Sequence, residues 1–201
     1  MALRVGLISD THGVLHPAVA RVFARVDHIL HTGDIGSAAV LAELTRLAPV
    51  TAISGNADGP PLSRLPRARC VELGGIRILL VHHGFVHARP TAELAAGLRR
   101  YRPTVAVFGH SHVAFVTRRL GILLVNPGGG GRRRFRLPRS VAVLTIGVRD
   151  VRARVTVLDT RAAVRREMPA APAPQTAGPD RGCRGRRTPS RRASSRARGA
   201  G

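Results

Sequence analysis

The sequence predicts an α/β protein built around one large core. Apolar runs at Leu3–Ile8, Asp27–His31 and Val50–Ile53 have the length and composition of buried strands, and segments with helical spacing lie between them. Each of these strands ends in a turn that contains Asp or Asn, as in open α/β sheets that bind ligands at one edge. With 201 residues, 44% of them hydrophobic, the chain is long enough to bury one such core.

The two segments between these strands are predicted to be helices. Over residues 17–26, Pro17 suits a first helical turn, and apolar residues recur at helical spacing at Val19, Val22, Phe23 and Val26. A second helix is expected from about Ser37, a favourable N-cap residue, to Leu47.

The second half of the domain contains further strands and one helix. The Gly74-Gly75 pair predicts a tight turn between strands at 71–73 and 76–81. The other expected elements are a helix at 91–101, strands at 105–108 and 122–125, and a closing hairpin formed by 139–146 and 151–158. We therefore expect residues 1–160 to form one domain.

Arginine dominates the charge of the chain. The formal net charge is +22, and the chain has no lysine. Residues 161–201 contain eleven Arg and two acidic residues among Ala, Pro, Ser and Gly, so we expect a disordered tail. A coding bias toward arginine and attraction to polyanions both explain this charge, and the second predicts nonspecific nucleic-acid contact through the tail. The aromatic content of 3% argues against sequence-specific stacking of single-stranded bases.

The sequence carries no sign of export or of a membrane segment. No apolar run reaches the roughly 18 residues of a membrane span, and the N-terminus lacks the features of a signal peptide. We therefore expect a cytoplasmic protein. Cys70 and Cys183 lie far apart, and no structural disulfide is expected.

Polar residues at five predicted strand ends form a candidate metal site. Taken singly, each has an ordinary explanation as a turn residue, a helix cap or a core histidine. Together they would bring oxygen and nitrogen donors to one sheet edge. Ordinary solvated loops would not be expected to collect so many potential ligands in one place. The candidate ligands are Asp10, His12, Asp34, Asn56, His83, His110 and His112.

This donor set indicates two divalent ions. It exceeds the roughly four ligands that one zinc ion takes and suits two ions that share a bridging carboxylate. Carboxylate, amide and imidazole donors without cysteine favour Mn²⁺, our first expectation, or Zn²⁺, Fe²⁺ or Ni²⁺. Two ions about 3.5–4 Å apart clamp both oxygens of an in-line phosphoryl displacement, and water bound to such an ion becomes hydroxide near neutral pH. The expected chemistry is phosphoester hydrolysis without a side-chain nucleophile.

The order of the motifs resembles that of the calcineurin-like metallophosphoesterase superfamily. The shared pattern is Asp-x-His, Gly-Asp, Gly-Asn-x-Asp, His-Gly and Gly-His-x-His. The opening Ser-Asp-Thr-His-Gly and the later Asn126-Pro127-Gly128 are similar to those of its small YfcE-like phosphodiesterase branch. The resemblance covers about residues 3–158 and implies a four-layer α/β/β/α sandwich.

The resemblance also implies a role for each matching position. Asp34 would bridge the two metals. In our leading hypothesis, His83 and His110 together with the metal ions neutralise charge that develops on the phosphate. Asn126-Pro127-Gly128 would shape the floor of the site without binding metal. The first metal would be held by Asp10, His12 and His112, and the second by Asn56, His83 and His110.

The chain departs from the family pattern at two positions. Ala57 stands where many members have a His thought to protonate the leaving group, a contribution of about 10²–10⁴-fold, although the small branch often lacks it. Phe85 stands where some relatives have a further His, and His87 is the nearest substitute. His82 neighbours His83, and only one of two adjacent strand residues can face the metals. The family motif favours His83, which leaves His82 as a supporting or core residue.

A glycine run followed by arginines lies after the last motif. Gly128–Gly131 and Arg132–Arg134 allow two interpretations, a flexible solvated loop or a segment in which one Arg binds an anionic substrate beside the metals.

Two hypotheses for function follow. The first is a cytoplasmic two-metal phosphodiesterase that acts on a small phosphoester through a metal-bound hydroxide, with Asp34, His83 and His110 as catalytic residues. The alternative is a catalytically weak or inactive scaffold of the same fold for protein or nucleic-acid interaction, with which Ala57 is compatible. Assembly into a homo-oligomer stays open.

Overall fold

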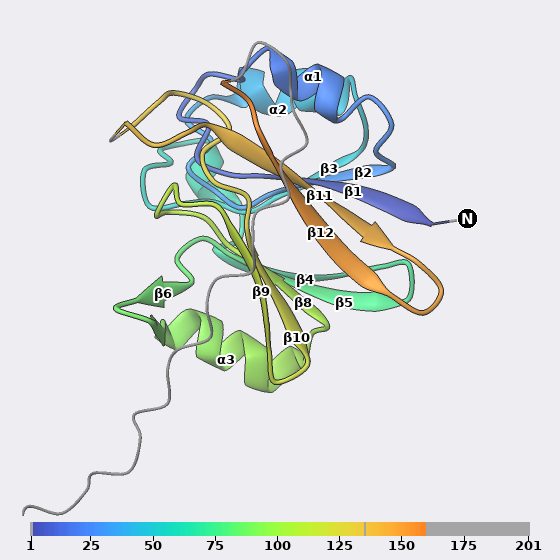
Figure 1. Ribbon diagram of the computed structural model, residues 1–201. Helices are drawn as coiled ribbons and strands as arrows, with labels where there is room; N and C mark the ends of the chain where they lie inside the picture. The colour runs from blue at the N-terminus through green and yellow to red at the C-terminus, as the bar shows by residue number, and fades with distance from the viewer. Residues whose placement is uncertain (1, 135, 160–201) are drawn as a thin grey trace, which may run out of the picture. The chain divides into compact units, whose positions relative to one another are not determined.

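Two five-stranded sheets pack face to face, and helices cover their outer faces (Figure 1). The computed structural model describes residues 2–134 and 136–159, and the predicted tail at 161–201 lies outside the described residues. From one side to the other, the layers are two helices, the first sheet, the second sheet and one helix. The expected α/β/β/α sandwich is confirmed.

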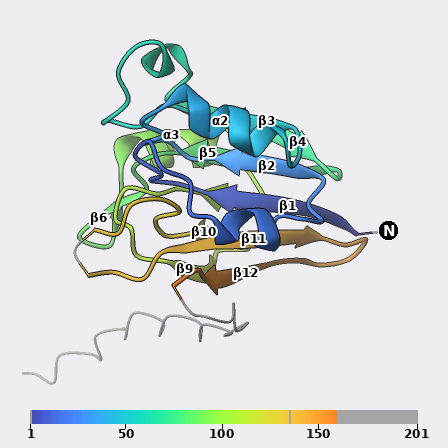
Figure 2. The ribbon, with the colours of Figure 1, turned by 90° about the horizontal axis from the view of Figure 1, so that it is seen from above.

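The first sheet has the strand order β12-β11-β1-β2-β3, which Figure 2 shows from above. The three N-terminal strands are parallel, and β11 joins them antiparallel to β1. Ser37 caps the second of the two covering helices, since its Oγ accepts a hydrogen bond from the Ala39 N–H at 3.2 Å. The elements are β1 (Leu3–Ile8), α1 (Ala18–Val22), β2 (His28–His31), α2 (Ala38–Thr45), β3 (Val50–Ala52), β11 (Ser140–Ile146) and β12 (Val151–Val157).

The second sheet has the strand order β4-β5-β8-β10-β9. Here β5, β8 and β10 are parallel neighbours, while β4 and β9 pair antiparallel at the two edges. Thr91 caps the covering helix by accepting a hydrogen bond from the Leu94 N–H. The elements are the 3-10 helix η1 (Leu62–Arg64), β4 (Ala68–Leu73), β5 (Ile76–Val81), β6 (Phe85–Val86), β7 (Arg89–Pro90), α3 (Ala92–Tyr101), β8 (Val105–Val107), β9 (Phe115–Arg119) and β10 (Ile122–Asn126).

Three apolar clusters separate the layers. The largest lies between the sheets, where Leu7 and Leu30 meet Ile78 and Val107. A second cluster, around Phe23, joins the first sheet to α1 and α2, and a third joins α3 to the second sheet. Each sheet is therefore covered on both faces, so the loops at the strand ends are left to form a site.

Several expectations from the sequence need correction. The first helix ends at Val22, although Phe23 and Val26 are buried as expected. The short strands β6 and β7, and the edge strand β9, were not predicted. The expected single sheet edge is wrong, because the candidate ligands come from the carboxyl ends of two sheets. Among the described residues, no helix has the length and apolar character needed to cross a membrane.

Candidate metal centre

Most of the candidate ligands lie in turns with an unusual backbone conformation. Asp10, His12, Asp34, His110 and His112 have φ between 46° and 69°, the left-handed region. This region is rare for residues other than glycine and costs about 1–3 kcal/mol for each residue, so such residues gather at functional sites. In this conformation the chain turns sharply after β1, β2 and β8, so consecutive side chains can face one point.

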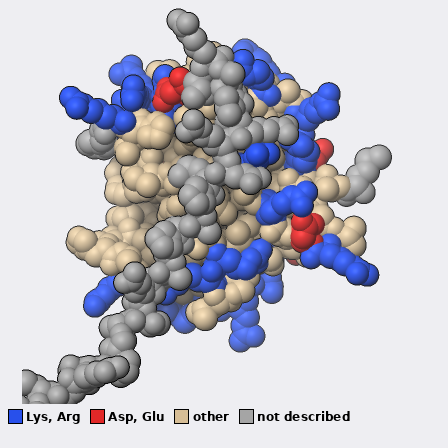
Figure 3. All heavy atoms as spheres, in the orientation of Figure 1, with Lys and Arg blue, Asp and Glu red and all other residues tan. Residues whose placement is uncertain are grey.

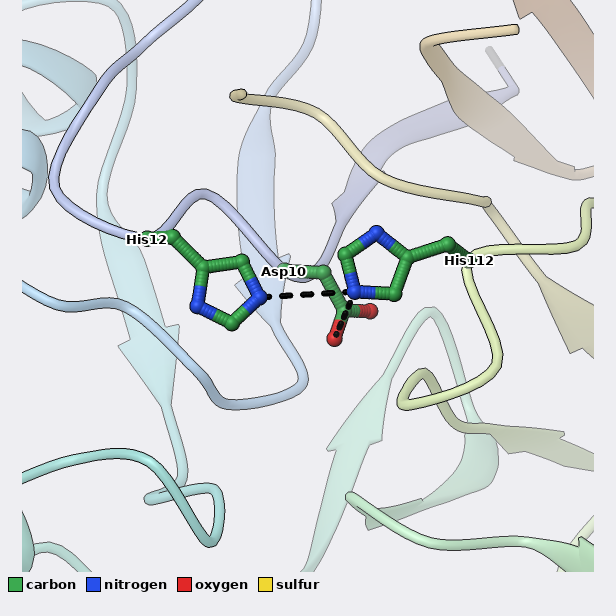
Figure 4. A group of neighbouring side chains, drawn as sticks. All are labelled: Asp10, His12 and His112. Atoms are coloured by element: carbon green, nitrogen blue, oxygen red, sulfur yellow. Dashed lines mark hydrogen bonds and ion pairs between the residues drawn. The ribbon is translucent and has the colours of Figure 1, made fainter. Parts of the chain in front are cut away.

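The first group of donors joins the end of β1 to the end of β8. Figure 4 shows the rings of His12 and His112 facing each other beside the Asp10 carboxylate. Their Nε2 atoms are 3.4 Å apart, and His112 Nε2 is 3.5 Å from Asp10 Oδ1. One donor atom from each of these residues lies within 4.8 Å of the others, so the three can hold one ion.

The second group consists of Asp34, His82 and His110, whose donor atoms also lie within 4.8 Å of one another. Asn56 lies beside this group, with its Oδ1 3.0 Å from His110 Nδ1. The Asp34 carboxylate lies between the two groups, because its Oδ2 is 3.4 Å from His82 Nε2 and 3.8 Å from His12 Nε2. Its other oxygen accepts a hydrogen bond from the Ala57 N–H at 2.8 Å, which holds the carboxylate in this orientation.

The structure differs from the sequence prediction at the histidine pair after β5. His82, not His83, lies with Asp34 and His110. The His82 Nδ1–H donates to the Thr32 carbonyl at 2.7 Å, so its Nε2 points toward Asp34. His83 is directed elsewhere, as expected for adjacent residues, and its ring packs on His110 with the centroids 4.1 Å apart. The structure therefore groups His82, and not the predicted His83, with Asp34 and His110.

The unmet bonding capacity of these groups fits a metal. Asp10 Oδ1 and His82 Nε2 are buried, and neither has a hydrogen-bond partner among the residues that the structure describes. A buried polar atom without such a partner costs about 1–3 kcal/mol, so it calls for an explanation such as an ion. His82 donates a hydrogen bond from Nδ1, which leaves Nε2 free to bind metal. Metal-bound imidazoles almost always donate from their second ring nitrogen in this way.

Burial and neighbouring charged groups together shift the pKa values of this site. It raises the pKa of Asp10 from 3.8 to about 6. For Asp34, burial would also raise the pKa, but the neighbouring His82 imidazole and a hydrogen bond from the Ala57 N–H outweigh it and lower the pKa to about 2. Burial and the neighbouring His12 lower the pKa of His112 to about 4. Burial also lowers the pKa of His12 and of His110, so the shifts at all three imidazoles favour the neutral form, which is the form that binds metal.

Residues that the sequence did not single out as functional hold the ligand turns in place. The Thr11 hydroxyl donates to the Ile35 carbonyl at 2.9 Å, so at 3.0 Å it accepts from His31 Nε2–H. His31 Nδ1 in turn accepts from the Gly33 N–H, and burial lowers the His31 pKa to about 3. These bonds join the turns after β1 and β2. The sequence interpretation left His31 open between a packed and a supporting residue.

Asp58 and Asn126 brace the remaining turns. The two carboxylate oxygens of Asp58 accept from the Gly36 and Gly55 N–H groups, each at 2.8 Å. Asn126 Nδ2 donates to the Gly109 carbonyl at 3.1 Å, and Asn126 Oδ1 accepts from the Gly128 N–H. Asn126 thus supports the turn that carries His110 and His112, which agrees with the floor role implied by the resemblance.

The glycine run is a packed floor and not a flexible loop. All of Gly128–Gly131 is buried. The Gly130 N–H donates to the Ser9 carbonyl at 2.8 Å, and the His16 N–H donates to the Gly130 carbonyl. A Cβ on Gly129 would lie 2.8 Å from His112 Nδ1, and one on Gly131 would overlap the Thr11 and Val14 carbonyls. Glycine is needed here because the backbone packs directly against the turns that carry the candidate ligands.

A cavity of about 430 Å³ opens beside the second group. Its lining includes His82, His110 and Asn56 from the second group, together with Arg67, His83 and Glu93. Ala57 supplies no acid group, as the sequence indicates. Phe85 packs on Phe108 with ring centroids 5.3 Å apart, while His87 lies exposed in the turn between β6 and β7.

Comparison with known proteins agrees with this geometry. Residues 3–148 match the family model of the calcineurin-like phosphoesterase superfamily domain. A probable metallophosphoesterase of Methanothermobacter thermautotrophicus is 36% identical over 148 residues, which are 71% of this chain and 85% of the relative.

Two solved structures share the fold. Vps29 of Entamoeba histolytica in complex with Zn²⁺ has a TM-score of 0.66 at 21% identity, over 80% of this chain and 95% of that one. An archaeal phosphodiesterase has a TM-score of 0.60 at 20% identity, over 76% of this chain and 99% of that one. With its motifs gathered at one site and a family model spanning most of the domain, the chain belongs to the calcineurin-like phosphoesterase superfamily.

Proposed function

We propose that the protein is a phosphodiesterase with a dinuclear metal centre. The observation that carries this proposal is the position of the Asp34 carboxylate between two groups of donors, one around Asp10 and one around His82. A shared carboxylate between two such groups is the arrangement that two neighbouring divalent ions require. Membership of a metallophosphoesterase family supports the same reading.

The residues divide between two ions. Asp10, His12 and His112 would hold the first, and His82, His110 and Asn56 the second, with Asp34 shared. Carboxylate, amide and imidazole donors suit Mn²⁺, and the Zn²⁺ complex of Vps29 makes Zn²⁺ the first alternative. When bound, such ions supply a Lewis acid for the phosphoryl oxygens and a hydroxide nucleophile near neutral pH.

The chain's own groups orient the site for this reaction. The His110 N–H donates to Asp10 Oδ2 at 3.0 Å, which turns the other carboxylate oxygen toward His112. Hydrogen bonds at Asp34 Oδ1 and His82 Nδ1 fix the second group in the same way. Because these bonds exist before substrate binds, little reorganisation is needed when charge develops on the phosphate.

The leaving group has no dedicated acid at position 57. Ala57 contributes its backbone N–H to Asp34 and has no side-chain proton to give. The site should therefore act best on esters whose leaving groups are stable as anions, such as aryl phosphodiesters. General acid catalysis typically raises the rate about 10²–10⁴-fold. Alkyl esters, which depend on it most, should therefore react more slowly by about that factor in addition to their lower intrinsic reactivity.

The experiment is Asp34→Asn with a matched control. We expect this variant to lose at least about 100-fold in turnover of an aryl phosphodiester in Mn²⁺ and to bind less metal by elemental analysis. Asp150→Asn, which removes an exposed carboxylate paired with Arg152, should behave as wild type. Unchanged turnover and unchanged metal content in Asp34→Asn would overturn the proposal.

A second candidate function is a binding scaffold. The likeness to Vps29 favours it, because that neighbour is known by its name as a vacuolar protein sorting protein. Ala57 is compatible with it, whereas the intact donor set favours the enzyme. A wild-type protein that binds metal but shows no metal-dependent turnover across mono-, di- and cyclic-nucleotide phosphoesters would establish the scaffold in place of the enzyme.

A further inference from the structure

A single carboxylate lies among the residues that line the cavity beside the second group. Of the described residues in this lining, only Glu93 has an acidic side chain. We propose that Glu93 determines substrate specificity by accepting hydrogen bonds from hydroxyl groups on the alcohol arm that stays attached to phosphorus. The substrate is then a phosphodiester of a neutral polyol, such as glycerol or a sugar. This inference rests on the proposed phosphodiesterase function and names its substrate class.

The fold holds Glu93 close to the candidate ligands. Glu93 lies in the first turn of α3, two residues after the cap residue Thr91. The Thr91 N–H donates to the Gly84 carbonyl at 2.9 Å, and the Thr91 hydroxyl donates to the His83 carbonyl at 2.7 Å. The start of α3 is therefore tied to the turn that follows β5 and carries His82. The backbone at Glu93 is thus held beside the second group before any substrate binds.

Glu93 is partly buried, yet its carboxylate has no partner in the described part of the chain. None of the ion pairs or side-chain hydrogen bonds among those residues involves it. An acid in the first turn of a helix gains about 0.3–1 kcal/mol from the helix dipole, but that gain does not require a position in a cavity. The carboxylate oxygens therefore keep their full capacity to accept hydrogen bonds from a ligand.

A carboxylate at this position opposes the binding of a phosphodiester. The two negative charges repel each other, and the repulsion is stronger at a partly buried site than in bulk water. Acidic residues are also scarce in this chain, which has 11 Asp and Glu against 33 Arg, and the face in Figure 3 shows many Arg and few acidic side chains. An acid in the substrate cavity of such a protein is best explained by a contact with the substrate that compensates for the repulsion.

The other charged group in the lining favours a neutral arm over a cationic one. Arg67 lines the same cavity and is exposed, and it forms no ion pair with Glu93. An ammonium group would bind Glu93 but would be repelled by Arg67, whereas hydroxyl groups can donate to the carboxylate and accept from the guanidinium. Because Ala57 offers no acid to protonate an alkyl leaving group, the hydroxylated arm is the one that stays on phosphorus. A cavity of about 430 Å³ is large enough for such an arm.

The test compares two p-nitrophenyl phosphodiesters that differ only in the second arm. One arm is 4-hydroxybutyl, and the other is pentyl, in which a methyl group replaces the hydroxyl. For wild-type protein in Mn²⁺, we expect kcat/KM to be about 10–100-fold higher for the hydroxybutyl ester, the range for a hydrogen bond to a charged group.

Substitution of Glu93 should change the two substrates in opposite directions. Glu93→Gln should lower kcat/KM for the hydroxybutyl ester and raise it for the pentyl ester, because the charge that repels the phosphate is gone. A merely structural role of Glu93 would move both values in the same direction. Glu43→Gln, which removes an exposed carboxylate on α2, should leave both values unchanged.

A binding measurement provides a readout that does not depend on turnover. Methyl 4-hydroxybutyl phosphate and methyl pentyl phosphate have only alkyl leaving groups, so both should react slowly enough for calorimetric titration in Mn²⁺. The dissociation constant should be at least about tenfold lower for the hydroxylated diester. Glu93→Gln should remove most of this difference, and Glu43→Gln should retain it.

The outcomes separate the inference from the proposed function. If aryl phosphodiesters are cleaved but the hydroxybutyl and pentyl esters react equally, or if the preference persists in full in Glu93→Gln, the inference is wrong and the phosphodiesterase stands. If a 4-aminobutyl ester is preferred over the hydroxybutyl ester and this preference depends on Glu93, the arm is cationic, and the polyol assignment is wrong. If no phosphoester is cleaved, the proposed function fails, and equal dissociation constants for the two methyl diesters would then overturn the inference as well.

Discussion

Asp10→Asn should stabilise the protein when metal is absent. Burial raises the pKa of Asp10 from 3.8 to about 6, so the folded protein holds this carboxylate in its charged form at a cost. A difference of about 2.2 pKa units corresponds to about 3 kcal/mol. The folded pKa lies above the unfolded one, so this cost is absent below pH 3.8, grows as the pH rises, and is complete above about pH 6.

The substitution removes the charge and keeps the geometry. Asn can still accept the hydrogen bond from the His110 N–H that Asp10 Oδ2 accepts at 3.0 Å. Its amide can donate to His112 Nε2, which lies 3.5 Å from Asp10 Oδ1. In urea denaturation with a chelator present, the variant should therefore be more stable than wild type by up to about 3 kcal/mol at pH 8 and equal to it near pH 4.

Metal should reverse this order. In Mn²⁺ the wild-type protein gains stability from the bound ion, and the variant, which lacks a ligand, gains less. Asp159→Asn serves as a control of opposite sign, because hydrogen bonds from Arg139 lower the Asp159 pKa and its removal should destabilise the protein. A variant at Asp10 that is less stable than wild type at pH 8 with chelator would refute the reasoning.

Three further predictions follow from the same turns. Burial lowers the pKa of His31 from 6.5 to about 3 in the folded state. Between pH 7 and pH 5 only the unfolded state takes up a proton at His31, so the free energy of unfolding falls by about 2 kcal/mol over this range. His31→Gln should flatten the pH dependence of urea unfolding by that amount, and an unchanged slope would contradict this. Gly131→Ala should lower the free energy of unfolding by at least about 2 kcal/mol and weaken Mn²⁺ binding, because the new Cβ meets the Thr11 and Val14 carbonyls. The control Gly59→Ala, whose Cβ has nothing within 4 Å, should change stability only slightly. Chelation should lower the Tm of wild-type protein at pH 8 in calorimetry, and an equal Tm with and without Mn²⁺ would argue against a metal site.

Local patterns predicted most of the candidate ligands that the structure brings together. Asp10, His12 and Asp34 follow strands whose apolar runs are clear in the sequence, and strand ends in α/β sheets are where such groups gather. Such patterns could not show which of His82 and His83 faces the candidate metal centre. The answer depends on which face of β5 packs against the other sheet. A shift of the strand register by one residue exchanges the directions of these two side chains.

Longer-range features were also hidden. The local patterns do not show that the strands divide into two sheets, which only the family resemblance implied. This division arises from pairing between residues far apart, as between β1 and β11. The strand β9 escaped prediction because Arg118 and Arg119 make it look like an exposed loop. The role of the glycine floor could not be predicted either, since packing against Thr11 is a contact between residues 120 positions apart.

The contact between His12 and His112 has a consequence for how the protein folds. These residues are 100 positions apart and belong to different sheets. An ion held there would close a loop of that size, and a covalent link over such a loop is worth about 4.7 kcal/mol in the chain-entropy model. Neither sheet alone contains a complete donor group, because each group takes residues from both. Tight metal binding would therefore report that the two halves of the sandwich have docked, which makes the ion a probe of that docking.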